Sequence, residues 1–318
     1  MTRSVLVTGA TGYLGSLLVA DLAAEPGNLE TIVAADIREP VQPIDGVTFV
    51  TADVRDSVLV DVLREHRVDV VVHLAAIVSP GKKPDRELEH SIDVGGTRNV
   101  LEASLAAGVR KVIVSSSGAA YGYYQDNPEW IDEEDSLRGN PEFAYSDHKR
   151  LVEEMLAEWR ADHPELQQLI FRPGTILGAG TRNQITDLFD RSVVLGIRGS
   201  ETPFVFIWDR DVVACLRRGI ETDATGIYNL AGDGAMPLRA IADAMGKRYV
   251  EIPAGAVRSA LGIMKRLGVT QYGPEQVNFL RYRPVLSNRR LKDGFGYTPQ
   301  KTSEEAFAFF LEARRGEA

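Results

Sequence analysis

Three glycines spaced three residues apart stand between an apolar run and a stretch of helical periodicity. The apolar run is Ser4–Thr8, the glycines are Gly9, Gly12 and Gly15, and the helical pattern covers Tyr13–Ala24. A strand that turns through glycines directly into a helix presents free backbone N–H groups at the helix N-terminus, which stabilise an anion such as phosphate. The spacing therefore predicts a phosphate-binding strand–turn–helix unit at the start of the chain.

Short apolar runs continue to alternate with helical stretches through the first half of the chain. The runs are rich in Val and Ile and lack strict alternation, which is typical of strands buried on both faces of a parallel sheet. Strands are expected at Ser4–Thr8, 31–35, 48–50, 68–74, Lys111–Ser115 and 169–171. Helices are expected at Tyr13–Ala24, 57–66, 92–107 and 145–161. This order of elements predicts an α/β fold with a doubly wound parallel sheet.

An acidic residue at the end of the second expected strand indicates which ligand the glycine-rich loop binds. Asp36 stands about 20 residues after Gly15, where a carboxylate accepts hydrogen bonds from the ribose hydroxyls of an adenine dinucleotide. The same carboxylate repels a 2′-phosphate, so we expect NAD as the cofactor. Arg38 leaves NADP as the less favoured alternative, because an arginine there can accommodate that phosphate.

A second pattern places a phenol and an ammonium group on one face of a helix. Tyr145 and Lys149 are four residues apart, and an ammonium beside a phenol favours the phenolate. Three consecutive serines ending at Ser117 lie at the carboxyl end of the strand Lys111–Ser115, where open α/β sheets bind ligands. Such a phenol can exchange the proton of a secondary hydroxyl while a nicotinamide exchanges hydride. The sequence thus predicts a hydride-transferring enzyme.

The pattern changes after about Pro173, where elements become shorter and Gly and Pro more frequent. We therefore predict an NAD-binding Rossmann domain over residues 1–172 and a smaller substrate-binding lobe over residues 173–318, partly interleaved with the first.

Composition excludes several other classes of protein. The 36 Lys and Arg against 45 Asp and Glu give a net charge of −9, whereas a general nucleic-acid binder needs a basic face. The single cysteine, Cys215, forms no internal disulfide, and the five histidines lack metal-ligand spacing, so no metal is expected. We expect no membrane span and a cytoplasmic location.

Beyond these local patterns, the chain resembles the extended short-chain dehydrogenase/reductases, known as the NAD-dependent epimerase/dehydratase family. The resemblance covers most of the chain. It rests on the loop from Gly9 to Gly15, Asp36, Asp53-Val54, His73-Leu74-Ala75-Ala76, Gly96-Thr97-Arg98-Asn99-Val100, the triple serine, Tyr145, Lys149 and Arg172-Pro173, and more weakly on residues 206–213 and 226–232.

The resemblance implies roles for individual residues. Ser117 becomes the catalytic serine, with Tyr145 as acid and base and Lys149 as its partner. Asp53 and Val54 are expected at the adenine, and Ala75 and Ala76 along the cofactor ribose. The full expected cofactor set is Gly9, Thr11, Gly12, Tyr13, Leu14, Gly15, Asp36, Ile37, Arg38, Asp53, Val54, Leu74, Ala75, Ala76, Ser115, Tyr145, Lys149, Arg172 and Pro173.

Departures from the family pattern narrow the expected reaction. Dehydratases of the family carry an Asp-Glu pair, and decarboxylating members a Glu, where this chain has Gly118 and Ala119. A 4,6-dehydratase or a decarboxylase is therefore not expected. A sugar-nucleotide epimerase and a simple dehydrogenase remain.

The substrate itself stays open. The epimerase pattern has an Asn where this chain has Thr175 and commonly a His where it has Trp208, while Arg281 or Arg283 lies near the position of a phosphate-binding Arg. The expected substrate residues are Ser117, Thr175, Trp208, Arg281 and Arg283. The Arg172-Pro173 pair also resembles steroid and flavonol-type reductases, which act on substrates without a nucleotide. An alternative of another class is a catalytically silent NAD sensor or scaffold.

The resemblance also implies a homodimer. Its interface would be a four-helix bundle formed by the helices that begin near Gly95 and Tyr145. The remaining expected partner is a small-molecule substrate, with neither nucleic acid nor membrane.

Overall fold

A seven-stranded parallel sheet forms the centre of the computed structural model, which describes residues 2–78, 84–267, 273–274 and 276–316. The strand order across the sheet is β10-β6-β5-β4-β1-β2-β3, and each neighbouring pair is parallel. Their bounds are β1 Ser4–Thr8, β2 Thr31–Asp36, β3 Val47–Thr51, β4 Val70–His73, β5 Lys111–Ser115, β6 Gln167–Pro173 and β10 Gly226–Leu230. The predicted doubly wound sheet is confirmed.

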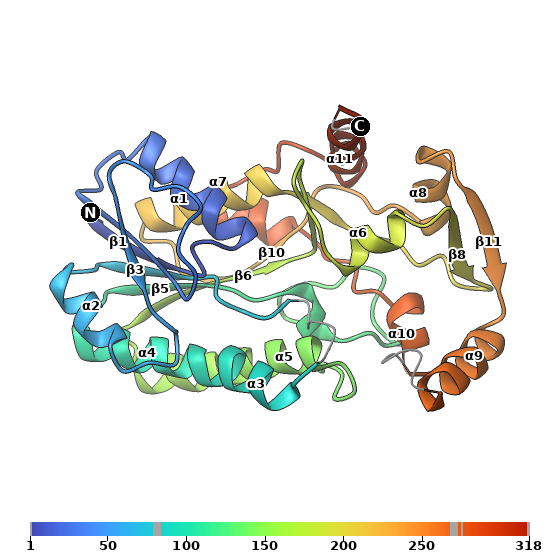
Figure 1. Cartoon of the computed structure of the whole chain (residues 1–318), viewed down its shortest axis with the longest axis horizontal. Helices are drawn as coiled ribbons and strands as arrows, with labels where there is room; N and C mark the ends of the chain where they lie inside the picture. Colours follow the sequence, from blue (N-terminus) through green and yellow to red (C-terminus); the bar gives the residue numbers. More distant parts are fainter. Residues whose placement is uncertain (1, 79–83, 268–272, 275, 317–318) are drawn as a thin grey trace.

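Helices cover both faces of this sheet, as Figure 1 shows. On one face, α1 (Tyr13–Ala24) and α7 (Asp209–Glu221) bury residues such as Leu18 and Leu216 against the sheet. On the other face lie α2 (Leu59–Glu65), α4 (Gly96–Ala107) and α5 (Ala144–Asp162). The sheet is thus buried on both sides, which explains why its strands lack alternation.

The helix expected over 92–107 begins earlier in the structure. A helical run starts at α3 (Arg86–His90), passes through the π turn η1 (Ser91–Gly95) and continues as α4. Asp85 caps its start by accepting a hydrogen bond from the backbone N–H of Leu88. An acidic N-cap residue followed by a polar first turn marks this earlier helix start. The apolar periodicity of the sequence gives no sign of it.

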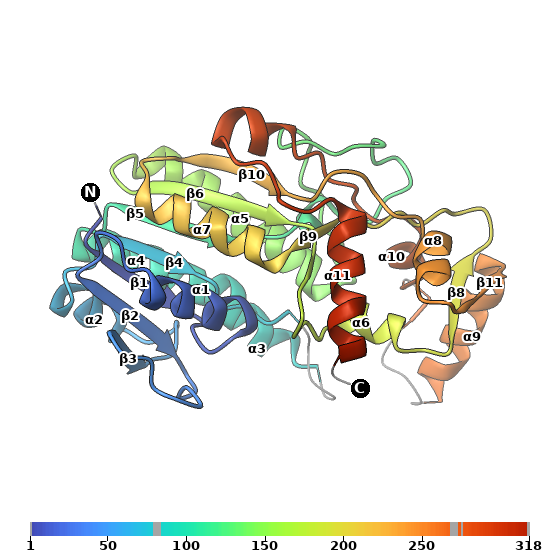
Figure 2. The same cartoon turned by 90° about the horizontal axis from the view of Figure 1, so that it is seen from above.

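The second half of the chain contributes to the main sheet and also builds a separate group of elements. Strand β10 pairs with β6, so residues beyond 172 complete the sheet. Most of the other elements gather beyond the carboxyl ends of the strands (Figure 2). They are β7 Thr175–Leu177, α6 Gln184–Phe189, β8 Val193–Ile197, β9 Phe206–Trp208, α8 Leu238–Ala244, β11 Arg248–Ile252, α9 Ala254–Arg266, α10 Gln276–Arg281 and α11 Ser303–Gly316. The turn η3 (Leu291–Phe295) instead packs on β10 and belongs to the core of the main sheet. The division of the chain at residue 172 stays a prediction.

Phenylalanines form the core of this second group. Phe204 and Phe206 stack at 5.7 Å between ring centroids, and Phe206 stacks on Phe307 at 5.4 Å.

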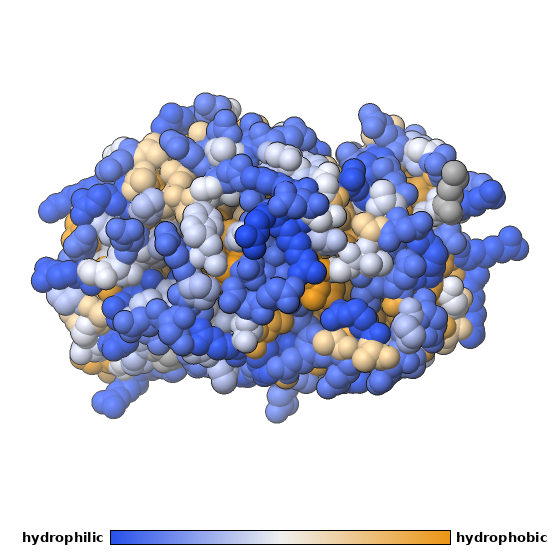
Figure 3. All heavy atoms as spheres, turned by 180° about the vertical axis from the view of Figure 1, so that it is seen from behind, coloured by the Kyte–Doolittle hydropathy of each residue, from blue (hydrophilic) through white to orange (hydrophobic). Residues whose placement is uncertain are grey.

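On the face in Figure 3, hydrophilic residues cover most of the surface, and hydrophobic ones gather in the recessed middle. Among the described residues, no helix has the length and apolar character needed to cross a membrane.

The strand order also places the site. The chain runs outward from β1 through β2 and β3, then returns to the other side of β1 with β4. Ligands of open α/β sheets bind at such a reversal, beyond the carboxyl ends of the strands. Thr8, at the end of β1, lies opposite His73 at the end of β4, and this end of the sheet opens into a cavity.

Candidate active site

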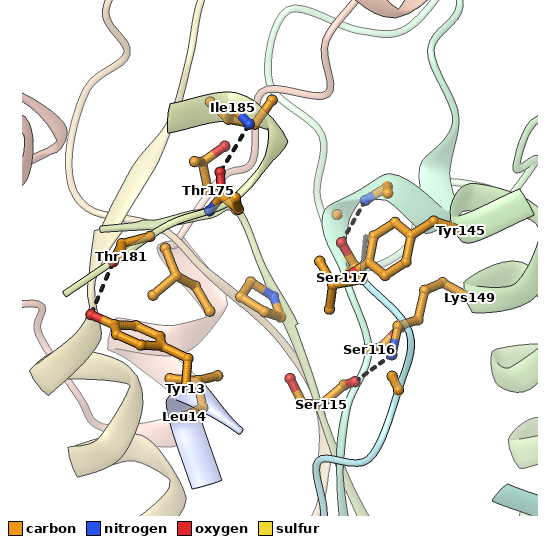
Figure 4. Close-up of a pocket in the computed structure, with 18 of the residues that line it drawn as sticks. Tyr13, Leu14, Ser115, Ser116, Ser117, Tyr145, Lys149, Thr175, Thr181 and Ile185 are labelled. Atoms are coloured by element: carbon orange, nitrogen blue, oxygen red, sulfur yellow. Dashed lines mark hydrogen bonds between the residues drawn. The ribbon is translucent and has the colours of Figure 1, made fainter. Parts of the chain in front are cut away.

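A cavity of about 680 Å³ lies at the carboxyl end of the sheet, between the glycine-rich loop and the second group of elements. Figure 4 shows Tyr13 and Leu14 on one side of it and Ser117, Tyr145 and Lys149 on the other. Of the residues expected to bind cofactor, those that line it are Gly9, Gly12, Tyr13, Leu14, Gly15, Arg38, Leu74, Ala76, Ser115, Tyr145, Lys149 and Pro173.

The glycines of the loop are required by its geometry. Gly9 has φ +67°, and a Cβ there would lie 2.7 Å from the backbone nitrogen of Ala75. A Cβ on Gly15 would overlap the carbonyl oxygen of Gly9. Helix α1 then begins after Gly12 with no side-chain cap and no acid in its first turn, which leaves its first N–H groups free for an anion. The loop therefore fits the diphosphate of a dinucleotide.

Asp36 ends β2 beside this loop, and its carboxylate is already oriented by two backbone groups. The N–H of Thr11 donates to Oδ2 at 3.0 Å and that of Arg38 to Oδ1 at 3.2 Å. The side chain of Arg38 is 71% exposed, and its Nε lies 4.0 Å from Asp36. A fixed carboxylate at this position fits a free ribose and disfavours a 2′-phosphate.

Other expected cofactor residues lie outside the cavity lining. Asp53 is held by the guanidinium of Arg55, with Nη2 to Oδ2 at 2.6 Å, which keeps the pKa of this carboxyl below its usual range. The other expected cofactor residues that do not line the cavity are Thr11, Asp36, Ile37, Val54, Ala75 and Arg172.

Arg172 turns away from the cavity into a buried ion pair. Its Nη2 donates to Oε2 of Glu153 at 2.6 Å, and its Nη1 donates to the hydroxyl of Tyr121 at 2.7 Å. Glu153 also accepts a hydrogen bond from Ser116 Oγ at 2.5 Å. Burial disfavours the charge on Arg172, but the contacts with Glu153 outweigh it and raise the pKa. The charge of Arg172 is thus matched inside the protein.

The expected catalytic residues meet at the other end of the cavity. Tyr145 and Ser117 lie side by side, and Lys149 Nζ donates to the carbonyl of Ser115 at 2.9 Å (Figure 4). Lys149 Nζ lies 5.7 Å from the centre of the Tyr145 ring. Helix α5 carries both side chains, while the end of β5 supplies the serines. The i, i+4 spacing therefore brings phenol and ammonium to one side of the cavity, as the sequence predicts.

Burial controls the protonation of this group. Burial raises the pKa of Tyr145 to about 12, against the hydrogen bond with Ser117, which lowers it. Burial holds the pKa of Lys149 below its usual range, while Asp93 and Glu153 raise it. A buried ammonium and a phenol in one cavity are suited to proton exchange with a bound hydroxyl.

Of the expected substrate residues, Ser117, Thr175 and Arg283 line the cavity. The guanidinium of Arg283 lies 4.2 Å from the centre of the Phe204 ring and 5.0 Å from that of Phe279, and its Nη2 donates to Thr175 Oγ1 at 3.4 Å. Its Nη1 is buried and has no hydrogen-bond partner within the described part of the chain. Arg283 is therefore a half-buried cation whose buried Nη1 has no described partner, which fits an anionic group of a ligand.

Trp208 and Arg281 lie outside the cavity lining. The indole of Trp208 packs on Phe309 at 5.5 Å, and the guanidinium of Arg281 covers the ring of Tyr282 at 4.6 Å. Nothing in the local sequence separates Arg281 from Arg283, because their different surroundings arise from contacts with distant segments.

Sequence reasoning missed Arg182 and an aromatic wall. Tyr123, Phe143 and Phe279 line the cavity and pack together, with Phe279 4.7 Å from Tyr123 and 5.3 Å from Phe143. Arg182 follows the buried Thr181 in the loop before α6 and also lines the cavity. No spacing within one element links these residues, so only the fold could identify them.

The charges around the cavity have one sign. Arg38, Lys149, Arg182 and Arg283 line it, and no Asp, Glu or His is among its described lining residues. Nor do the described residues hold a group of three or more His, Cys, Asp or Glu that could bind a metal ion. The described lining of the cavity thus suits an anionic ligand.

Comparison with known proteins establishes the family. Residues 5–231 match the model of the NAD-dependent epimerase/dehydratase family. The chain belongs to this family. The predicted family membership is confirmed, and with it NAD as the cofactor on which the family depends. The glycine loop and Asp36 fit this cofactor.

Curated relatives cover nearly the whole chain at low identity. The UDP-glucose 4-epimerase of Mycolicibacterium smegmatis is 28% identical over 330 residues, which cover 98% of this chain and 99% of that protein. An uncharacterized protein of Mycobacterium tuberculosis is 25% identical over 317 residues, covering 98% of this chain and 84% of that protein.

Solved structures share the fold. The UDP-glucose 4-epimerase of Thermotoga maritima, solved with UDP-glucose, has a TM-score of 0.75 at 19% identity, with 99% of each chain covered. The dTDP-glucose 4,6-dehydratase of Bacillus anthracis, solved with NAD, has a TM-score of 0.75 at 16% identity, with 99% of this chain and 97% of that one covered. Because an epimerase and a dehydratase match equally well, the fold alone does not choose the reaction.

Proposed function

We propose that this protein catalyses reversible, NAD-dependent hydride transfer at a secondary hydroxyl of an anionic substrate, as a sugar-nucleotide epimerase or a dehydrogenase. One observation carries the proposal: the Ser117–Tyr145–Lys149 group opens onto a cavity lined by four cations and, among its described residues, by no acid. A dinucleotide and a nucleotide diphosphate both need such a lining, because each brings negative charge into a partly buried site.

Each catalytic residue has a defined task in this proposal. The Tyr145 phenolate accepts the proton of the substrate hydroxyl as it becomes a carbonyl, and the phenol returns it in the reverse direction. The Ser117 hydroxyl, hydrogen-bonded to Tyr145, orients the reacting oxygen. The Lys149 ammonium, held by the Ser115 carbonyl, favours the phenolate and would hold the nicotinamide ribose of bound NAD. Bound NAD supplies the hydride acceptor and donor.

The same cavity argues against elimination or decarboxylation. Gly118 and Ala119 line it where the resemblance places acids in dehydratases and decarboxylases. A Cβ on Gly118 would lie 2.9 Å from Cδ1 of Leu286, so a carboxylate there would need Leu286 to move. A 4,6-dehydratase activity is therefore not proposed, and neither is a decarboxylase.

Arg283 supports an anionic substrate over a neutral one. Its half-buried guanidinium packs among Phe204, Phe279 and Tyr123, with a buried Nη1 that no described residue satisfies. Burying a cation without an acidic partner is costly, so a ligand phosphate that supplies the partner would bind strongly.

The aromatic wall favours a second candidate. Tyr123, Phe143 and Phe279 offer an apolar surface beside Tyr145 that suits a flat or steroid-like ketone in a reductase of non-nucleotide substrates. Under this alternative, Arg283 holds a carboxylate or another single anionic group.

Thermal melting separates these candidates. NAD at a hundred times its dissociation constant stabilises by about 2.7 kcal/mol, which raises the melting temperature by several degrees. UDP, dTDP and GDP are then added to the NAD complex. A further rise with one nucleotide supports the sugar-nucleotide activity, and its absence favours the reductase.

A catalytic assay decides between enzyme and silent sensor. The NAD complex is mixed with UDP-glucose or UDP-galactose, and with panels of secondary alcohols, and absorbance of reduced nicotinamide is recorded. Reduction of the bound NAD while the ketone product stays on the protein indicates an epimerase. Reduction with release of the ketone into solution indicates a dehydrogenase. If no compound changes the absorbance and UDP-glucose and UDP-galactose are not interconverted while NAD still binds, the protein is a sensor or scaffold.

The homodimer and the cytoplasmic location belong to the same proposal. Helices α4 and α5 lie on one face of the sheet, and the half-buried Ile92, Leu151 and Trp159 leave apolar surface there for a second copy. Light scattering at micromolar concentration tests this, and a monomeric mass would count against it.

A further inference from the structure

Three segments far apart in the sequence meet at the hydroxyl of Tyr13, on the cofactor side of the cavity. Tyr13 begins α1 directly after the glycine-rich loop, Thr181 lies in the loop before α6, and Asp209 begins α7. The Tyr13 hydroxyl donates to Asp209 Oδ2 at 2.7 Å and accepts from Thr181 Oγ1 at 2.9 Å. Figure 4 shows the second of these bonds at the edge of the cavity.

The surroundings of this hydroxyl are built to fit it. A Cβ on Gly178 would overlap both the Tyr13 hydroxyl and the Asp209 carboxylate, so only glycine leaves room for the pair. Thr181 and Asp209 are buried. Burial raises the pKa of Tyr13, so its hydroxyl keeps its proton near neutral pH.

These contacts join two walls of one cavity. Gly9, Gly12 and Gly15 line it from the phosphate-binding side, while Thr181, Arg182, Asn183 and Ile185 line it from the facing loop. Tyr13 is 36% exposed and also lines the cavity, and its hydroxyl links the glycine-loop wall to the facing loop through Thr181. The linked walls border the space in which a dinucleotide on the glycine loop would bind.

We propose that Tyr13, Thr181 and Asp209 form a latch that controls how fast NAD enters and leaves. This goes beyond the proposed reaction and rests on its NAD site. The latch bonds join protein groups only, so they break and re-form each time a dinucleotide passes. Removing them speeds entry and exit together and leaves the affinity nearly unchanged. A slow exit would hold the cofactor through both hydride transfers of an epimerase.

The variant Tyr13→Phe keeps the ring in the cavity wall and removes only the hydroxyl. NADH is the probe, because its fluorescence reports binding and its release is followed by displacement with excess NAD. We expect the association and dissociation rate constants each to rise about tenfold, with the dissociation constant changed by less than about threefold. Thr181→Val removes one of the same bonds and should act in the same direction.

A matched control removes a different phenol. Tyr124 donates to the carbonyl of Gly139 at 2.6 Å and does not line the cavity, so Tyr124→Phe should leave both rate constants unchanged. The double variant of Tyr13→Phe and Thr181→Val should exchange no faster than Tyr13→Phe alone, because both substitutions open the same latch.

The outcomes separate the latch from simpler roles. Unchanged exchange in Tyr13→Phe with normal NADH binding overturns the latch and leaves the proposed function intact. Faster dissociation with an equal loss of affinity also overturns it, because Tyr13 would then be an ordinary cofactor contact. Additive effects in the double variant overturn the shared latch. If the wild-type protein binds no NADH, the proposed function fails as well.

Discussion

Helix α5 carries two polar groups one helical turn apart, and their hydrogen-bonding environments differ. Tyr145 and Lys149 face the cavity, and within the described part of the chain the ammonium donates a hydrogen bond to the Ser115 carbonyl alone. Glu153, four residues further on, is 4% exposed and fully engaged by Arg172 and Ser116. A buried group with spare hydrogen-bonding capacity beside a cavity is available for chemistry, whereas a fully matched pair contributes to the fold.

The largest effect that would break this comparison is expected at Tyr145. Tyr145→Phe removes the only proton carrier that we assign to the reaction, and hydride transfer should fall by about 10³-fold or more. NAD binding and melting temperature should change little, because the ring remains. Nicotinamide absorbance under single-turnover conditions measures the rate, with Tyr124→Phe as the control. Retained turnover would remove the catalytic assignment.

The matched pair should show the reverse behaviour. Glu153→Gln leaves the Arg172 charge buried without a carboxylate, and breaking such a pair costs about 3 to 5 kcal/mol of unfolding free energy. Urea unfolding measures the loss. Glu154→Gln is the control, because the half-exposed Glu154 forms, among the described residues, an ion pair with Arg150 alone, where about 0.5 kcal/mol is expected. Equal losses in the two variants would contradict a structural role for Glu153.

These two groups also show how far sequence reasoning reaches. The strand–loop–helix unit and the Tyr145–Lys149 spacing are local patterns, so their geometry follows from neighbouring residues. Arg172 was expected at the cofactor, but its guanidinium reaches Glu153, and only the packing of α5 against β6 decides this. Arg182 and Phe279 reach the cavity through loops and helices of the second half, which no periodicity places.

A neutral polar group offers a third case beneath the same site. His73 is 3% exposed and lies between Thr8 Oγ1 at 2.8 Å and Thr97 Oγ1 at 3.0 Å. Burial lowers the pKa of His73 to about 3 from an ordinary value of 6.5. Below pH 6.5 the imidazole of His73 therefore binds a proton in the unfolded chain but stays neutral in the folded protein. The free energy of unfolding contributed by this difference is fully present above pH 6.5 and is lost as pH falls toward 3.

The expected slope is about 0.7 kcal/mol per pH unit at pH 6.5 and rises toward about 1.4 kcal/mol per pH unit near pH 5.5, before most carboxylates titrate. Urea unfolding at pH 7.0, 6.0 and 5.5 measures it. His73→Asn should be less stable at neutral pH and should lose this slope, while His163→Asn, at a side chain 35% exposed, should keep it. If His73→Asn keeps the slope of the wild-type protein, another group whose pKa is lowered on folding must be its source.

The smallest expected effect concerns Ser117 and tests how the reactive group is tuned. Its hydrogen bond lowers the pKa of Tyr145 against the effect of burial, which raises that pKa. Alcohol oxidation needs the phenolate, so its rate should rise with pH up to the pKa of Tyr145 in the working complex. Removing the hydroxyl in Ser117→Ala raises that pKa, and the profile should move to higher pH by up to about one unit. Ser116→Ala, whose hydroxyl serves Glu153 instead, should lower stability without moving the profile. Two outcomes would contradict these separate roles of the two serines. One is a shift of the profile to lower pH in Ser117→Ala, and the other is an equal shift in both variants.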